Sequence, residues 1–233
     1  MKQEFNKYTT EDFEVWQLLF NRQIVNLEGK VHQYYFDYIE ELKGVLNEKS
    51  IPRFDDLNQE LMKSQGWSIE VVPGLIPVKD FFMFLSKKRF CSSTWMRKRN
   101  QMDYLEEPDM FHDIFGHVPL LMNEDYSNFT QEIGAIGVKH WDNDDIVKQL
   151  QRLYWYTIEF GLIKEHGNVQ IYGAGIISSS AETNHVFEEG VNHIPYDIDV
   201  CRSRDFVIPE VQLDYFAIDS FKQLFGTLSK LKF

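Results

Sequence analysis

Two histidines in the largely apolar stretch EEPDMFHDIFGHVPLL, residues 106–121, have a spacing that could serve a metal ion. On an α-helix, five residues turn through roughly 500°, so His112 and His117 would point about 140° apart. Gly116 and Pro119 can end the helix, which would let both imidazoles converge. We therefore expect His112 in the last helical turn and His117 in the following loop. A simpler interpretation is that these histidines interact with carbonyl groups at the helix end.

A carboxylate strengthens the metal interpretation. Glu159 lies between two apolar residues in the segment RLYWYTIEFGLIK. Its burial would cost several kcal/mol unless the carboxylate is paired, protonated or bound to a cation. Arg152, on the same helical face, is one candidate partner. Two histidines and a carboxylate also form the facial set that binds ferrous iron and leaves open positions for oxygen and substrate. Zinc is the alternative metal, but the chain lacks the HExxH spacing typical of zinc hydrolases.

Composition limits the partners. The chain has 233 residues, 43% of them hydrophobic, with 36 acidic and 24 basic residues and a net charge of −12. Such a charge repels phosphates and anionic lipids, so we expect neither nucleic acid nor a membrane as partner. No segment approaches the ~18–20 apolar residues of a membrane span. Two distant cysteines, Cys91 and Cys201, favour a reducing compartment, and we predict a cytoplasmic protein.

Hydrophobic periodicity predicts a helix-dominated fold with a small β component, in the α+β class. Residues 8–46 indicate helix packed on helix, capped at Thr10 or Asp12 and interrupted at Gly29 and Gly44. Further helices are expected at 51–67, from Lys79, at 142–167 and at 219–233. Strands are expected near 68–72, in 169–179 and in 204–218. We find no repeat or linker, so residues 1–233 are predicted to form a single domain.

Three motifs give the chain a family resemblance: EPDMFHDIFGHVPLL, YWYTIEFGL and YGAGIISSSAE. From about Tyr8 onward the sequence resembles the pterin-dependent aromatic amino acid hydroxylases, particularly the short bacterial phenylalanine-hydroxylating members. The resemblance implies a mostly helical catalytic domain in which Fe(II), a tetrahydropterin and O2 act together on an aromatic amino acid. It carries His112, His117 and Glu159 over as iron ligands.

The resemblance also assigns the substrate residues. Arg97 matches the arginine that binds the substrate carboxylate, and Asp109 matches the acidic residue that orients it. Without the resemblance, Arg97 in WMRKRN would be taken as a solvated surface charge. Ser178 matches a serine bonded to the first iron-ligand histidine, and we group it with the substrate pocket.

The pterin residues follow in the same way. Gly74, Ile76 and Phe81 match the loop and the stacking phenylalanine of the family's pterin site, and Asp113 matches an acidic residue that faces the pterin ring. The five other histidines gain no role from the match and are taken as structural or exposed.

Two positions disagree about the substrate. Trp155 matches phenylalanine and tyrosine hydroxylases, whereas Ile208 is more similar to tryptophan hydroxylases. A tryptophan in the pocket wall fills volume that an indole needs, so we predict conversion of phenylalanine to tyrosine, with tryptophan hydroxylation as the alternative. Leu105 and Cys91 depart from the family pattern and leave the pocket shape open.

Two other functions remain open: a His2Glu zinc hydrolase, and a pterin-binding protein without activity. The resemblance suggests neither a regulatory nor a tetramerisation domain, so a monomer is expected.

Overall fold

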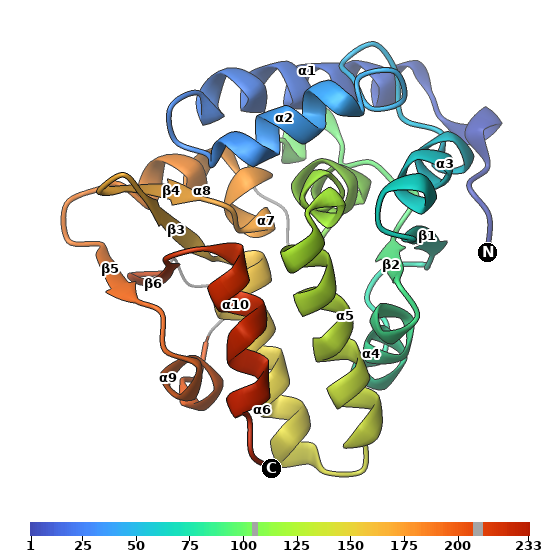
Figure 1. Cartoon of the computed structure of the whole chain (residues 1–233). Helices are drawn as coiled ribbons and strands as arrows, with labels where there is room; N and C mark the ends of the chain where they lie inside the picture. Colours follow the sequence, from blue (N-terminus) through green and yellow to red (C-terminus); the bar gives the residue numbers. More distant parts are fainter. Residues whose placement is uncertain (104–106, 207–211) are drawn as a thin grey trace.

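The first long helix shows how local sequence determines an element. The computed structural model describes residues 1–103, 107–206 and 212–233 (Figure 1). Helix α1 (Thr10–Leu27) begins after Thr9, whose side chain accepts the backbone N–H of Asp12, while the Asp12 carboxylate accepts the backbone N–H of Thr9. This reciprocal pair is a capping box. The predicted cap at Thr10 or Asp12 was therefore wrong by one residue: Thr9 is the cap and Asp12 its partner.

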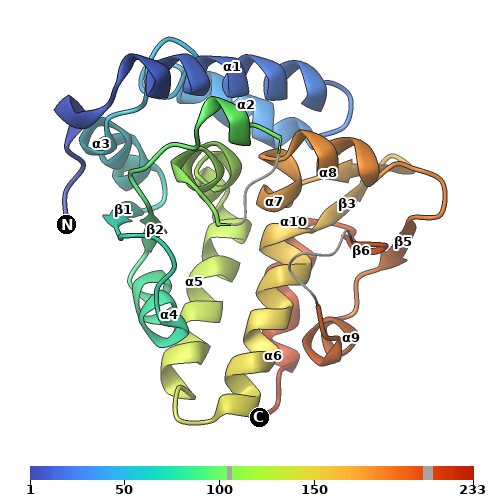
Figure 2. The same cartoon turned by 180° about the vertical axis from the view of Figure 1, so that it is seen from behind.

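The helices form two groups that differ in direction. Helices α1 and α2 (Gln33–Glu41) cross one end of the molecule, and α5 (Glu124–Lys139), α6 (Asp144–Tyr154) and α10 (Phe221–Thr227) run away from them (Figures 1 and 2). The other helices are shorter: α3 (Phe54–Ser64), α4 (Val78–Ser86), α7 (Ala174–Ile177), α8 (Ser180–His185) and α9 (Ile198–Ser203). Short 3₁₀ helices lie at Phe5–Lys7, Arg99–Gln101, Pro119–Met122 and Leu228–Lys230. Helices α5, α8 and α9 had no counterpart in the sequence prediction. The helix expected at 142–167 was too long, because the helical segment ends at Glu159 and Leu162–Glu165 is a strand.

The strands form two small sheets. β1 (Ser68–Val71) pairs in parallel with β2 (Arg89–Ser92). The larger sheet has the order β4-β3-β6-β5, with β3 (Leu162–Glu165) antiparallel to β4 (Asn168–Ile171) and parallel to β6 (Asp214–Ile218). Strand β5 (Asn192–Pro195) lies parallel to β6 at the edge. The strand expected in 169–179 is only half right, because Ala174–Ile177 is helical.

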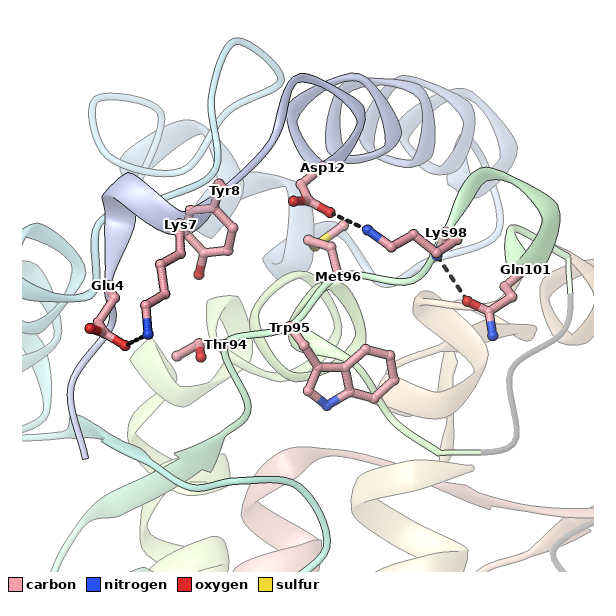
Figure 3. A pocket seen from close by; sticks show the side chains of 9 residues that line it. All are labelled: Glu4, Lys7, Tyr8, Asp12, Thr94, Trp95, Met96, Lys98 and Gln101. Atoms are coloured by element: carbon pink, nitrogen blue, oxygen red, sulfur yellow. Dashed lines mark hydrogen bonds and ion pairs between the residues drawn. The ribbon is translucent and has the colours of Figure 1, made fainter.

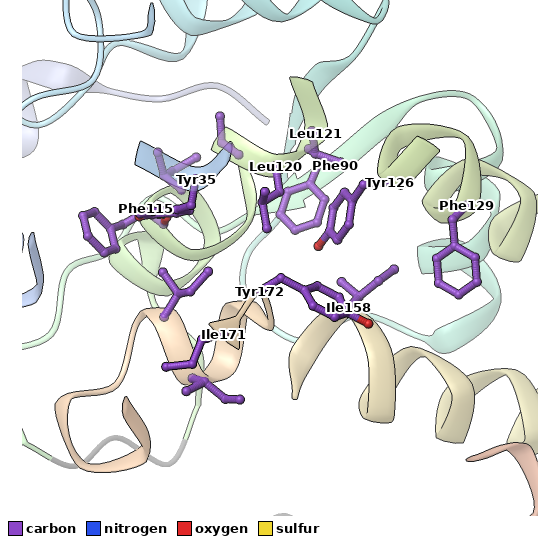
Figure 4. Close-up of a cluster of buried hydrophobic side chains, with 14 of the residues drawn as sticks. Tyr35, Phe90, Phe115, Leu120, Leu121, Tyr126, Phe129, Ile158, Ile171 and Tyr172 are labelled. Atoms are coloured by element: carbon purple, nitrogen blue, oxygen red, sulfur yellow. The ribbon is translucent and has the colours of Figure 1, made fainter. Parts of the chain in front are cut away.

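The core joins elements from the whole described chain. Its buried aromatic and aliphatic side chains come from α2, β2, α5, β4 and the segments around them, and Figure 4 shows Tyr35, Phe90, Phe115, Tyr126 and Tyr172 converging from separate elements. The predicted class, mainly α with a small β component, is confirmed. Among the described residues, no helix has the length and apolar character needed to cross a membrane.

Candidate active site

Two π-helices carry the predicted metal ligands. His112 and His117 begin and end the π-helix His112–His117 (η3), and Glu159 ends the π-helix Trp155–Glu159 (η5), which continues α6. In η5 the backbone N–H of Phe160 donates to the carbonyl of Trp155 at 2.9 Å, a bond that spans five residues. π-helices are rare and occur frequently at functional sites.

The π-helix corrects the predicted break before His117. Since a π-helix bonds each residue to the fifth one along the chain, residues five apart lie about one turn apart on the same face. The two imidazoles therefore converge inside a continuous helix. Gly116 does not end that helix. A Cβ atom at Gly116 would lie 2.9 Å from the carbonyl oxygen of Ala174, so this glycine allows η3 to pack closely against α7.

The three ligand side chains meet at one point. His112 Nε2 and His117 Nε2 are 3.2 Å apart, and the nearest Glu159 oxygens lie 3.6 and 3.3 Å from them respectively. Two ligands that each lie about 2.1 Å from one ion are roughly 3.0–3.4 Å apart for angles of about 90–109° at the ion. The spacing of these three groups fits a single metal ion. Arg152, the alternative partner for Glu159, instead donates from Nε to Asp205 at 3.0 Å, so that alternative was wrong.

Ser178 determines which nitrogen of His112 carries the proton. The Ser178 hydroxyl donates to the carbonyl of Ala174 at 2.9 Å and lies 2.8 Å from His112 Nδ1. A carbonyl only accepts and a hydroxyl has one proton, so the Ser178 oxygen must accept from His112 Nδ1–H. The lone pair of His112 Nε2 then points toward Glu159 and His117. Such support of a histidine ligand is typical of metal sites.

The charge states of this cluster also suit a cation. Burial, partly opposed by the nearby Glu159, lowers the pKa of His112 to about 4, so its imidazole is neutral at neutral pH. Burial alone would raise the pKa of Glu159, but His117 and His112 together lower it below its ordinary value. The lone pair of the neutral His112 imidazole and the ionised Glu159 carboxylate thus converge, an arrangement that favours a positive charge between them. The residues present fit a divalent metal.

Arg97 is buried, not solvated as its basic neighbours suggested. Its Nε and Nη2 donate to the two carboxylate oxygens of Asp109 at 2.9 and 2.8 Å. The Asp109 side chain is fully buried and also accepts the backbone N–H of His112 at 3.1 Å. One carboxylate therefore fixes both the guanidinium and the first turn of η3. On its Nη1 side, Arg97 lies 3.5 Å from the carbonyl oxygen of Met102, its one hydrogen-bond partner there among residues 1–103, 107–206 and 212–233.

Of the residues assigned to the pterin, Phe81 is connected to this cluster by aromatic contacts. Gly74 and Ile76 are in the loop between β1 and α4, and Gly74 has a φ of +155°, which strongly favours glycine. The Phe81 ring, in α4, packs edge-on against Tyr154 at 5.2 Å, and Tyr154 stacks with His117 at 6.5 Å. Aromatic rings thus connect Phe81 to the metal-ligand candidate His117.

Asp113 and Cys91 lie at the β2 side of η3. The Asp113 carboxylate accepts the backbone N–H of Ser93 at 2.9 Å. Burial raises the pKa of Asp113 well above its ordinary value, so this carboxyl group retains a proton more readily than an exposed aspartate. Burial, with a contribution from Asp113, also raises the pKa of the Cys91 thiol to about 12. Cys91 is therefore a neutral, buried thiol.

The predicted substrate wall is partly described. The Trp155 indole stacks on Phe206 at 4.3 Å with 9° between the ring planes, and it packs against Phe160 at 4.4 Å. Ile208 and Leu105, the two other pocket positions named from the sequence, lie outside the described residues.

A surface cavity of about 470 Å³ is lined in part by Met96 and Lys98, the residues on either side of Arg97 (Figure 3). Trp95, Met96 and Lys98 line it together with residues of the N-terminal segment, and Lys98 donates to Asp12 at 3.1 Å. None of the three metal-ligand candidates contributes to its lining. The cavity is therefore distinct from the His112, His117 and Glu159 cluster.

Sequence reasoning missed Tyr154 and Phe90. Phe90 covers the imidazole of His117 at 4.7 Å, and the fully buried Tyr126 lies deeper in the same core. Tyr154 precedes Glu159 by five residues, the same spacing as between His112 and His117. That repeated spacing is the signal that could have identified Tyr154.

Comparisons with known proteins agree with the resemblance. Residues 4–232 match the family described as "Biopterin-dependent aromatic amino acid hydroxylase". The phenylalanine-4-hydroxylase of Ralstonia nicotianae is 42% identical over 226 residues, covering 97% of this chain and 71% of that protein.

Two solved structures of phenylalanine hydroxylase from Chromobacterium violaceum superpose closely. One holds iron(III) and oxidised 7,8-dihydrobiopterin, with a TM-score of 0.93, 40% identity, and coverage of 97% of this chain and 82% of that chain. The other holds iron and phenylalanine, with a TM-score of 0.90, 38% identity, and coverage of 97% and 81%.

Proposed function

We propose that this chain, which belongs to the biopterin-dependent aromatic amino acid hydroxylase family, hydroxylates phenylalanine to tyrosine with iron, a tetrahydropterin and O2. The observation that carries the proposal is the convergence of His112, His117 and Glu159, beside a buried arginine already oriented by Asp109. The names of the relatives and the phenylalanine-bound structure of the Chromobacterium enzyme support phenylalanine as the substrate.

His112, His117 and Glu159 would hold the iron. When bound, the iron and the reduced pterin supply the electrons that activate O2 for attack on the aromatic ring. Ser178 keeps the His112 lone pair directed at the metal, and Phe90 covers His117 and excludes water from that side. Three protein ligands of this kind would leave positions on the metal open for the reaction.

Arg97 would bind the substrate carboxylate. Asp109 occupies the Nε and Nη2 edge, so the Nη1 side remains for a second carboxylate. A guanidinium suits this task because its donors are planar and permanently charged. Asp109 also bonds to the backbone of His112, so a substrate held by Arg97 has a fixed position relative to the metal.

Gly74, Ile76, Phe81 and Asp113 would form the pterin site. Phe81 offers a flat apolar face for a heterocycle. Asp113, with its raised pKa, could exchange a hydrogen bond with the polar edge of the ring as either donor or acceptor.

Trp155 would form the wall that excludes an indole substrate, and we place Ile208 in the same pocket by the resemblance alone. Phenylalanine is favoured over tryptophan because steric exclusion of a larger ring is harder to overcome than the loss of one favourable contact. The zinc hydrolase and the inactive pterin-binding protein are set aside, because the matched family is one of pterin-dependent hydroxylases.

We further propose that residues 1–233 act as one catalytic domain, as a monomer and in the cytoplasm. The net charge of −12 opposes association between copies, and the two buried free cysteines suit a reducing compartment. Light scattering of the purified protein tests the monomer, since a dimeric mass at micromolar concentration would contradict it.

Product analysis tests the function. The purified protein, loaded with ferrous iron and supplied with tetrahydropterin and O2, is incubated separately with phenylalanine, tyrosine and tryptophan. We expect tyrosine from phenylalanine and little turnover of the others. Zinc in place of iron should give none. Turnover that persists when His112, His117 or Glu159 is replaced by alanine would refute the assigned ligand set. Activity without the pterin would refute the proposed pterin dependence.

A further inference from the structure

Two residues that flank segment 207–211 both contact Trp155. On one side Phe206 stacks on the indole. On the other, the side-chain oxygen of Gln212 accepts the indole N–H at 3.4 Å. The direction of the indole therefore depends on the bond to Gln212 and on the aromatic stack.

His185 holds the backbone of Gln212 from the opposite side. The His185 Nε2 lies 2.9 Å from the carbonyl oxygen of Gln212, and Nδ1 lies 2.8 Å from a carboxylate oxygen of Glu188. A carbonyl and a carboxylate only accept hydrogen bonds, so both ring nitrogens must donate. His185 therefore makes both bonds only as an imidazolium ion.

The charges around His185 support this protonated form. Burial lowers the pKa of His185, but the bonds to Glu188 and Gln212 and the charge of Glu182 raise it above the ordinary value overall. Glu182 lies on the same helix, α8, and accepts the hydroxyl of Tyr215 in β6 at 2.8 Å. Glu188 follows α8 and is mostly exposed. Within the described part of the chain, these are the titratable groups that act on His185 from α8, from the turn after it and, through Tyr215, from β6.

We infer that His185 and Gln212 are positioning residues that hold Trp155 in place and thereby set the preference for phenylalanine over tryptophan. The inference rests on the proposed function, in which Trp155 is the pocket wall. His185 fixes the Gln212 carbonyl, Gln212 fixes the indole, and the indole occupies the volume that a tryptophan substrate would need. Neither positioning residue contacts the metal ligands through any bond described above, so the effect should fall on specificity and not on iron binding.

The experiment measures the ratio of kcat/KM for phenylalanine to kcat/KM for tryptophan in direct competition. Gln212→Met removes the acceptor at similar volume, and His185→Phe removes both donors. Each should lower the ratio by about three- to tenfold, the usual effect of losing one hydrogen bond. Iron content and KM for the pterin should stay unchanged. His193→Phe is the matched control, because His193 also donates to a backbone carbonyl, that of Val186 at 2.7 Å, but lies in β5.

The pH dependence of the same ratio gives a second readout. Both substrates share the metal, the pterin and Arg97, so titrations of those groups cancel in the ratio. In the wild type, the ratio should fall as pH rises and His185 loses a proton, because a neutral imidazole can keep only one of its two bonds. His185→Gln keeps a donor for Gln212 but cannot be charged, so its ratio should stay constant with pH.

The outcomes separate the inference from the proposed function. If the wild type hydroxylates neither amino acid, the proposed function fails. If Trp155→Phe lowers the ratio but Gln212→Met and His185→Phe do not, the function stands and the positioning role is wrong. A ratio unaffected by Trp155→Phe removes the premise and overturns the inference, and so does an equal change in His193→Phe.

Discussion

Replacement of Ser178 by alanine should weaken iron binding through the tautomer of His112. The Ser178 oxygen accepts His112 Nδ1–H at 2.8 Å, in a site where the Ser178 residue is 5% exposed. Without that acceptor the N–H is left with little access to water, which costs about 1–3 kcal/mol. Since about 1.4 kcal/mol is a factor of ten, iron affinity should fall by roughly 5- to 150-fold. Losses of about 10- to 100-fold are usual when such supporting groups are removed.

The assay is anaerobic competition for ferrous iron between the protein and a chelator of known affinity. Nitrogen NMR of the metal-free protein reports the tautomer of His112 directly, which a change in folding stability alone would not alter. Ser179→Ala is the control, because Ser179 only caps α8 by accepting the backbone N–H of Glu182. Its iron affinity should equal that of the wild type. Wild-type affinity and an unchanged tautomer in Ser178→Ala would refute the reasoning.

Three other changes have defined outcomes. Arg97→Ala should lower kcat/KM for the amino acid by roughly 30- to 4000-fold, or about 2–5 kcal/mol, with iron content unchanged; steady-state kinetics that match the wild type would return Arg97 to a structural role. Gly116→Ala should lower the free energy of unfolding by about 1–3 kcal/mol in denaturant titrations, because its Cβ would meet the carbonyl of Ala174 at 2.9 Å. Gly226→Ala should leave the free energy of unfolding unchanged, because a Cβ atom there would have no other atom within 4 Å. Equal losses in the two variants would contradict the packing argument. The pKa of His185 is raised in the folded state, so the protonated imidazole stabilises the fold. This contribution to the free energy of unfolding is complete below about pH 6.5 and is lost as pH rises through the folded pKa. His185→Gln should lack this decline in unfolding free energy, and an identical pH profile would exclude the imidazolium.

The sequence alone identified the metal-ligand candidate Glu159 but not the burial of Arg97. Glu159 attracted attention because an ionisable group stood in an apolar helix, and that argument requires only residue types and periodicity. Arg97 could not be placed in the same way. Its neighbours Lys98 and Arg99 are exposed, and its partner Asp109 lies twelve residues away, so burial of the guanidinium follows from tertiary packing. Only the family resemblance indicated its role in advance.

The strand predicted in 169–179 was wrong in part for the same reason, because tertiary contacts outweigh local propensity. The segment Gly173 to Ser178 is glycine-rich and β-branched, which favours a strand, yet Ala174–Ile177 is helical. A Cβ atom at Gly173 would lie 2.4 Å from the carbonyl oxygen of Glu159, so the chain must pass very close to η5 at this point. The resulting turn into α7 brings Ser178 to His112. Contact with another element, not local propensity, determines the structure here.

The five-residue spacing of His112 and His117 explains why the predicted helix break was wrong and why the predicted convergence of the two imidazoles was right. An α-helix could not bring His112 and His117 together, and from that correct geometry a helix break was inferred, because π-helices are too rare to be expected from one pair of residues. The second ligand helix has the same spacing, from Tyr154 to Glu159, and the Tyr154 ring stacks with His117. In both segments, two polar or aromatic residues stand five positions apart, and the second of them is a residue type that binds metals. Two π-helices explain this shared pattern better than two helix breaks would. Each inserted residue turns a ligand toward the same point, which explains why the two segments must depart from α-helical geometry together.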